Sequence, residues 1–230
     1  ATRCKKDGGD WIINGNKMWI TNGSLADVAV VWARDEEGIV RGFLLEKGMD
    51  GFTSSDIHGK LSLRCSVTSE LSMSDVRVPD SSRLPNIEGL KGPLGCLTQA
   101  RYGIAWGMVG AAVDSYNVSL EYAKERKQFS KPIAGYQLTQ AKFAEMITNI
   151  TQAQLLVYRL GRLKDEGKMK FQQVSMAKRN NCTMARDIAR MARDILGGNG
   201  VTIDYSPIRH MANIESCLLY TSDAADESVG

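Results

Sequence analysis

The stretch SSRLPNIEGLKGP, residues 81–93, divides the chain into two kinds of sequence. It is rich in turn-forming residues, and the spacing of apolar residues changes across it. Before it, apolar and polar residues alternate in short segments, whereas after it apolar residues recur every three or four positions. The change predicts a multi-domain α and β chain, with a β domain at residues 1–90 followed by a helical domain.

Residues 10–80 carry the signals of β-strands. The segment WIINGNKMWIT has two β-rich arms around Asn14-Gly15, which predicts a hairpin that turns at this dipeptide. The runs ADVAVVWAR and RGFLLEK flank the charged turn DEEG, and LSLRCSV, SELSMSD and VRVP predict further short strands. This many short strands indicates a small antiparallel β-sandwich or barrel.

Three long helices are predicted after the connector, at about residues 94–126, 136–165 and 171–196. The third ends at Gly197-Gly198, a common helix stop. The second carries an apolar stripe formed by Leu138, Met146, Ile150, Ala153, Val157 and Leu160. Together they predict an α-helical bundle domain over residues 91–216.

Three glycines, Gly103, Gly107 and Gly110, recur on one face of the first predicted helix. Each costs roughly 1 kcal/mol of helix stability relative to alanine. A neighbouring helix or a ligand could approach this face closely, and we interpret it as a site of close helix packing.

The composition is that of a soluble globular protein, with 43% hydrophobic and 24% charged residues. No apolar run approaches the roughly 18 residues that span a bilayer, so membrane insertion is not expected. A net charge of +3 is too small to indicate a nucleic-acid partner. The five cysteines are scattered and form no CxxC pair, which favours reduced thiols inside a cell over disulfides or a zinc site.

Few segments indicate chemistry by themselves. The two histidines, His58 and His210, are too few for a metal cluster, and no glycine-rich nucleotide-binding motif occurs. The third predicted helix carries four arginines, which indicate a solvated basic face rather than a phosphate site: Arg179, Arg186, Arg190 and Arg193.

Three motifs in a particular order are more informative. MWITNG in the β region, ERKQF followed by Gln137, and RDILGGNG at the end of a long helix together resemble the acyl-CoA dehydrogenase family. The resemblance covers residues 1–216. ARYGIAWG, GFLLEKGMDGF, HGKLSLR and KRNNC further resemble the glutaryl-CoA dehydrogenase branch of that family.

The resemblance implies an FAD-dependent enzyme that removes a proton from the α carbon of an acyl-CoA and transfers a hydride from the β carbon to FAD. In the glutaryl branch the implied reaction is oxidative decarboxylation of glutaryl-CoA to crotonyl-CoA, with electrons passed to an electron-transfer flavoprotein. It also implies a homotetramer, in the cytoplasm of a bacterium or the mitochondrial matrix of a eukaryote.

The resemblance also implies FAD contacts. Trp19, Ile20 and Thr21 match the segment that lies against the isoalloxazine, and Arg126 and Gln137 match positions that hold the diphosphate and adenosine part. The turn that meets the FAD of a neighbouring subunit is matched by Asp194, Ile195, Leu196, Gly197 and Gly198. Ser130 replaces the glycine usual after ERKQF, and we expect little functional loss from that change.

Substrate contacts are implied for the beginning of the first long helix, at Leu94, Gly95, Cys96, Leu97, Thr98, Gln99, Ala100 and Arg101. No catalytic residue can be assigned. The base of the glutaryl branch is a Glu in a TYEGT-like segment shortly after a stretch like IRHMANIE, and Glu215 matches an earlier acid.

The segment CLLYTSDAADE stands where the TYEGT-like segment is expected. It resembles the translated end of a sequencing-library adapter, so we expect residues 217–230 to be a non-native tail. We also expect the family's N-terminal helical domain to be absent from this sequence.

Two other hypotheses remain open at this point. The chain can belong to another acyl-CoA dehydrogenase, with a straight or branched acyl chain as substrate. It can also be a non-catalytic helical module that binds a partner through its basic face. An FAD-loaded oligomer would exclude the second of these.

Overall fold

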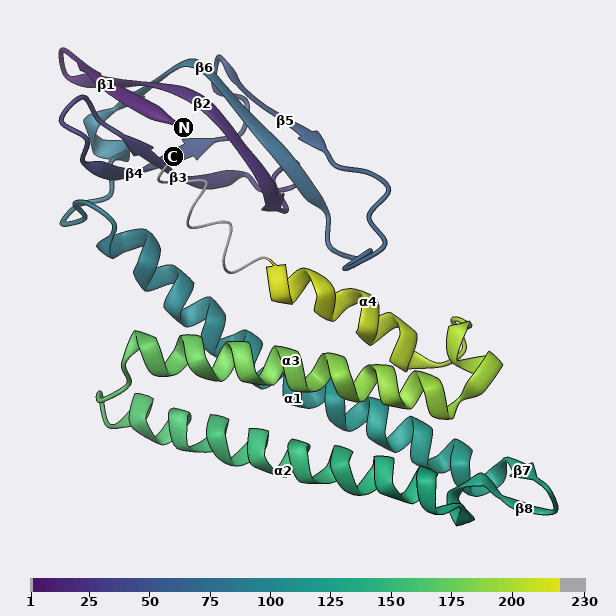
Figure 1. Cartoon of the computed structure of the whole chain (residues 1–230). Coiled ribbons are helices and arrows are strands. Elements are labelled where there is room, and N and C mark those ends of the chain that lie inside the picture. The colour runs from purple at the N-terminus through teal and green to yellow at the C-terminus, as the bar shows by residue number, and fades with distance from the viewer. Residues whose placement is uncertain (1, 220–230) are drawn as a thin grey trace. The chain divides into compact units, whose positions relative to one another are not determined.

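The computed structural model describes residues 2–219, which form two compact units. One unit ends at Leu97 and the other begins at Thr98 (Figure 1). The first holds a six-stranded sheet and the second is almost entirely helical. The helix α1 (Lys91–Glu125) begins in the first unit and continues in the second.

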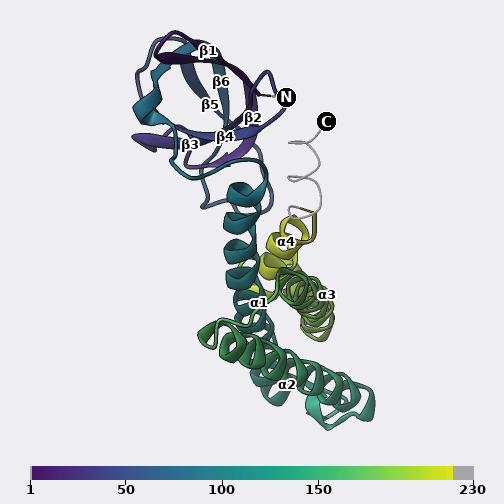
Figure 2. The same cartoon turned by 90° about the vertical axis from the view of Figure 1, so that its left-hand side faces the viewer.

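The sheet of the first unit has the strand order β4-β3-β1-β2-β6-β5. Its neighbours are antiparallel, except that β1 and β3 meet in parallel at the pair Arg3 and Arg34. Figure 2 shows the sheet curving around its buried face. The strands are β1 (Arg3–Asp7), β2 (Asp10–Thr21), β3 (Val28–Arg34), β4 (Val40–Glu46), β5 (Phe52–Asp56) and β6 (Thr68–Pro79). This confirms the predicted class of a small, mainly antiparallel β domain followed by a helical bundle.

The core of the sheet follows from alternation along the strands. Trp11 and Ile13 of β2 are buried opposite Val78 and Val76 of β6. The indole nitrogen of Trp11 donates to the Asp80 carboxylate over 2.8 Å, so the buried ring keeps a partner for its polar atom. The inward residues of β2 and β6 thus fix the register of the central pair.

The predicted hairpin at Asn14-Gly15 is wrong. The strand β2 runs unbroken through both residues because it pairs with β1 on one side and β6 on the other. The Asn-Gly pair instead sits at a bulge, where Asn14 exchanges two hydrogen bonds with Asp75 of β6 over 2.8 and 2.9 Å. The hairpin turn lies earlier, at Gly8-Gly9 between β1 and β2.

Other strand predictions also need correction. LSLRCSV forms part of a loop, in which the Lys60 ammonium donates to the Ser66 carbonyl over 2.8 Å and to the Thr68 hydroxyl over 2.6 Å. SELSMSD and VRVP belong to the single strand β6, while β1 and β5 were not predicted as strands. The runs on either side of DEEG form β3 and β4 as predicted.

The long helices of the bundle lie close to their predicted positions. They are α1, α2 (Gln137–Asp165) and α3 (Phe171–Ile195), followed by α4 (Ser206–Leu219). The helix α1 begins earlier than predicted because Pro93 lies in its first turn, where a proline removes no helical hydrogen bond. Short elements connect them: η1 (Asp80–Ser82), β7 (Lys127–Gln128), β8 (Lys131–Pro132), η2 (Ile133–Gly135) and η3 (Gly197–Val201).

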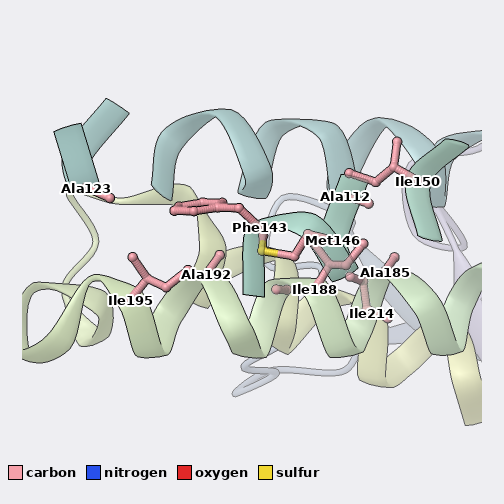
Figure 3. Close-up of a cluster of buried hydrophobic side chains, with 11 residues drawn as sticks. Ala112, Ala123, Phe143, Met146, Ile150, Ala185, Ile188, Ala192, Ile195 and Ile214 are labelled. Carbon is pink, nitrogen blue, oxygen red and sulfur yellow. The ribbon is translucent and has the colours of Figure 1, made fainter. Parts of the chain in front are cut away.

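The bundle core is built from the apolar stripe of α2 against α3 and α4. Figure 3 shows Phe143 and Met146 of α2 over Ile188 of α3 and Ile214 of α4. Most of the predicted stripe is buried, but Leu138 is 84% exposed, whereas Phe143, which was not predicted as part of the stripe, is buried.

The predicted close packing against Gly103, Gly107 and Gly110 is also wrong within the described residues. No described atom lies within 4 Å of the position that a Cβ would take at any of the three. The buried face of α1 is formed by Ala105, Val109 and other small residues instead.

The helix α4 is attached to α1 by a polar cluster. Asp114 accepts a hydrogen bond from Ser206 and lies 2.8 Å from the Nε2 atom of His210. His210 therefore has a structural partner.

The predicted non-native tail begins at Cys217, which is buried within α4. Residues 220–230 of the tail lie outside the described part of the chain.

Candidate functional site

The first candidate surface lies in the β unit, at the end of β2. Between Lys17 and Ile20 the register against β6 shifts, because β2 contains one more residue than its partner. Trp19 lies in this bulge with a φ of 62°, a left-handed conformation that costs a bulky residue about 1–3 kcal/mol. A bulge of this kind redirects a side chain, and the Trp19 indole is 45% exposed.

The residues after the bulge fix its position. Thr21 pairs with Thr68, and the Asn22 amide donates to the Val67 carbonyl over 2.9 Å. Only glycine fits at position 23, because a Cβ there would lie 2.9 Å from the Cβ of Ser69. The MWITNG motif is thus a rigid support for an exposed indole and an exposed hydroxyl.

This surface fits a flat aromatic ligand with polar atoms along one edge. The indole of Trp19 offers an apolar face, and the exposed Thr21 hydroxyl lies two residues further along the strand. The isoalloxazine ring has these complementary features. The residues present are therefore consistent with a flavin.

The second candidate surface lies in the helical unit, at the end of the bundle where α1 ends and α2 begins (Figure 1). Arg126 directly follows α1, and its carbonyl accepts from the Ile133 amide over 2.8 Å. Gln137 is the first residue of α2. Both side chains are exposed and have no side-chain partner among residues 2–219.

The turn after α3 belongs to the same end of the bundle. Asn199 donates to the hydroxyl of Tyr122 over 3.1 Å, and Lys142 of α2 forms an ion pair with Asp194. Gly197 has a φ of 59°, and only glycine fits at position 200, where a Cβ would lie 2.2 Å from the Arg193 carbonyl oxygen.

The exposed parts of this turn are its backbone and one carboxylate. Ile195 and Leu196 are buried in the core, whereas Gly197 and Gly198 are exposed with open space around them. Asp194 is exposed as well, and the hydrogen bond from Lys142 lowers the pKa of its carboxyl group. The glycines allow a ligand to approach the backbone closely.

The chemistry of this second surface fits a diphosphate. A guanidinium forms paired hydrogen bonds with phosphate oxygens. Among residues 2–219, no side chain caps the N-terminus of α2 at Tyr136, and the free amides of a helix N-terminus favour an anion. Arg126, Gln137 and the glycines therefore suit the diphosphate and sugar part of a dinucleotide.

Two residues of this surface were missed by sequence reasoning. Phe129 lies in the turn between β7 and β8, three residues after Arg126 in the sequence, and is 92% exposed. Phe129 belongs to the ERKQF motif, so the motif could have identified it as a site residue. No sequence motif points to Lys142, because its partner Asp194 is far away in sequence.

The segment expected to contact substrate forms the first turns of α1. Five residues of the segment are exposed and the other three are half-buried; the exposed residues are Leu94, Gly95, Cys96, Gln99 and Ala100.

Glu215 of α4 accepts a hydrogen bond from Arg190 over 2.8 Å, so this acid has a structural partner.

The arginines of α3 are largely neutralised by acids. Arg186 pairs with Asp187, Arg190 with Glu215, and Arg193 lies 3.5 Å from Asp194. The helix thus presents much less net positive charge than its sequence indicates.

Residues 2–219 contain neither a membrane-spanning helix nor a group of metal ligands. None of the helices in this range is both long enough and apolar enough to cross a membrane. No three His, Cys, Asp or Glu side chains in it come together as metal ligands.

Comparison with known proteins identifies both units. Residues 1–76 match the middle domain of acyl-CoA dehydrogenases, and residues 88–220 match the C-terminal domain of the same family.

Solved structures and curated relatives agree with these matches. A glutaryl-CoA dehydrogenase from Mycobacterium smegmatis in complex with FADH2 is 50% identical, with a TM-score of 0.94, over 97% of this chain and 58% of that one. Butyryl-CoA dehydrogenase from Megasphaera elsdenii is 31% identical over 100% of this chain and 62% of that one, with a TM-score of 0.90. The short/branched chain specific acyl-CoA dehydrogenase of Rattus norvegicus is 35% identical over 89% of this chain and 48% of its own length.

The chain thus spans about half the length of the curated relatives that it matches. The matches cover both of its units, and the predicted motifs lie in the matched ranges. The chain belongs to the acyl-CoA dehydrogenase family.

Proposed function

We propose that the chain is part of an FAD-dependent glutaryl-CoA dehydrogenase, which converts glutaryl-CoA to crotonyl-CoA and carbon dioxide and passes electrons to an electron-transfer flavoprotein. The observation that carries this proposal is the 50% identity with the Mycobacterium smegmatis glutaryl-CoA dehydrogenase over 97% of the chain. Identity with the butyryl and short/branched chain relatives is lower, at 31% and 35%.

The two candidate surfaces would hold different parts of FAD. Trp19 would lie against one face of the isoalloxazine, and the Thr21 hydroxyl would hydrogen-bond its polar edge. Arg126 and Gln137 would bind the diphosphate and ribose, with the Phe129 ring beside the adenine. When bound, FAD accepts the hydride from the β carbon of the acyl-CoA.

We further propose that each FAD is shared between copies of the chain in a homotetramer. The β unit of one copy would hold the flavin ring, and the Asp194–Gly198 turn of a neighbour would contact the rest of the cofactor. The exposed first turns of α1, Leu94 to Arg101, would position the acyl-CoA. Orienting the substrate in this way lowers the entropic cost of the reaction.

Another acyl-CoA dehydrogenase remains the second candidate, because the curated relatives act on short or branched chains according to their names. The third hypothesis, a non-catalytic binding module, is disfavoured by the ion pairs that neutralise Arg186, Arg190 and Arg193.

The test is to recover the full-length gene and compare kcat/KM for glutaryl-CoA, butyryl-CoA and isovaleryl-CoA with an electron acceptor. We expect glutaryl-CoA to be preferred at least about tenfold, which corresponds to about 1.4 kcal/mol, and to yield crotonyl-CoA and carbon dioxide. A preference for one of the other substrates would instead identify the second candidate.

A further inference from the structure

The proposed cofactor surface contains a negative charge, the Asp194 carboxylate, although the diphosphate that it would bind is also negative. Asp194 begins the turn that is proposed to meet FAD, and its carboxylate is 54% exposed. A diphosphate carries negative charge, so an uncompensated carboxylate beside it would weaken binding. An aspartate carboxyl group is ionised at neutral pH, and the hydrogen bond from Lys142 lowers the pKa of Asp194 further.

Lys142 supplies the closer of two positive charges beside Asp194. It lies five residues after Gln137, about 1.4 turns along α2, and its ammonium donates to Oδ2 of Asp194. The other carboxylate oxygen lies 3.5 Å from the Arg193 guanidinium. Lys142 is 38% exposed and is the contact that links the start of α2 to the end of α3 through charge.

We propose that Lys142 is a positioning residue for the cofactor: it neutralises the Asp194 carboxylate, so that the Asp194–Gly198 turn accepts a diphosphate. The inference rests on the proposed role of this turn in FAD binding. It assigns Lys142 an effect through Asp194 rather than a direct contact with phosphate.

The expected effect is moderate and electrostatic. In Lys142→Met, FAD should dissociate roughly three- to tenfold more readily, since the ion pair is partly exposed and a carboxylate near a diphosphate repels it weakly through water. The loss should shrink towards zero in 1 M salt, where the screening length is about 3 Å. Lys142→Arg keeps the charge and should bind FAD almost as well as the wild type.

The decisive variant combines Lys142→Met with Asp194→Asn. Removing the carboxylate removes the repulsion, so the double variant should bind FAD within about twofold of the wild type. Asp194→Asn alone should bind at least as tightly as the wild type. If the double variant binds as weakly as Lys142→Met, then Lys142 acts on FAD directly or through the fold, and the inference is wrong.

The measurement is a titration of the 230-residue chain with FAD, followed by flavin fluorescence, with thermal melting of each variant. Lys168→Met is the matched control, because it removes a lysine paired with Glu166 over 3.2 Å in the loop between α2 and α3. It should leave FAD affinity unchanged.

Arg126→Gln separates this inference from the proposed function. If the wild type binds no FAD, or if Arg126→Gln binds FAD equally well, both the proposed cofactor surface and the inference about Lys142 are wrong. If Arg126→Gln weakens FAD binding and Lys142→Met does not, the proposed surface is supported and only the role of Lys142 is wrong.

Discussion

Thiol labelling should divide the five cysteines into two that react in the native chain and three that do not. Cys65 and Cys96 are exposed, whereas Cys4, Cys182 and Cys217 are buried. We expect Ellman's reagent at pH 8 to modify two thiols rapidly and the other three only after denaturation. The prediction tests both units, because the first holds buried Cys4 with both exposed thiols and the second holds the buried pair Cys182 and Cys217.

The size of the difference follows from the ionisation of the thiols. Burial raises the pKa of Cys4 to about 12, with Asp35 contributing, and burial raises that of Cys182 to about 11. At pH 8 the reactive thiolate would be about 0.1% of Cys182 and about 0.01% of Cys4, against roughly a quarter of an unperturbed cysteine. Labelling of Cys4 and Cys182 should therefore slow by about a hundredfold or more, before steric protection is counted.

The same assay examines the proposed substrate segment. Saturating acyl-CoA should protect Cys96, which lies in that segment, and leave Cys65 unprotected; Cys65→Ser and Cys96→Ser assign the two rapid phases. A third thiol that reacts as fast in the native chain would refute the reasoning from burial. Equal labelling of Cys96 with and without acyl-CoA would remove the support for substrate contacts at the start of α1.

Three further predictions concern stability. Met146→Ala should lower the free energy of unfolding by about 2–5 kcal/mol, because Met146 is fully buried, whereas Leu138→Ala should change it by less than about 0.5 kcal/mol. Burial alone would raise the pKa of Asp114, but its hydrogen bonds with Ser206 and His210 lower it. The ionised carboxylate therefore stabilises the fold, and Asp114→Asn should destabilise the chain above about pH 5. This destabilisation should disappear as the pH falls below about 4 and the wild-type carboxylate becomes protonated. Ser130→Gly should stabilise by up to about 1 kcal/mol, because Ser130 has a φ of 69° in the turn between β7 and β8.

Each of these outcomes can be contradicted in chemical or thermal unfolding. Equal effects of Met146→Ala and Leu138→Ala would contradict the orientation of α2. An Asp114→Asn effect that does not decrease at all as the pH falls below about 4 would show that the ionised carboxylate is not its cause. A destabilising Ser130→Gly would contradict the left-handed turn.

The helices could be predicted because one local pattern determines them. The stripe from Met146 to Leu160 must face a core, and glycines follow the end of α3. The strands were harder, since their pairing depends on neighbours distant in sequence. Asn14-Gly15 is a strong local turn signal, yet pairing of β2 on both sides overrode it and left a bulge.

The candidate site was predicted from motifs rather than from periodicity. The family motifs located Trp19, Arg126 and the glycine turn, but they gave no sign that Trp19 is left-handed or that Asn199 is fixed by Tyr122. Lys142 could not be found from sequence, because an ion pair between two helices depends on how those helices pack.

Hydrogen exchange measured with and without FAD tests the central claim most directly, because it locates the cofactor without any substitution. The account predicts slower exchange in two places: residues 17–22 at the end of β2, and the segments 126–137 and 194–200 at the end of the bundle. ADP, which lacks the flavin ring, should protect only the second place. Protection confined to other segments, or no protection at saturating FAD, would contradict the assignment of both surfaces.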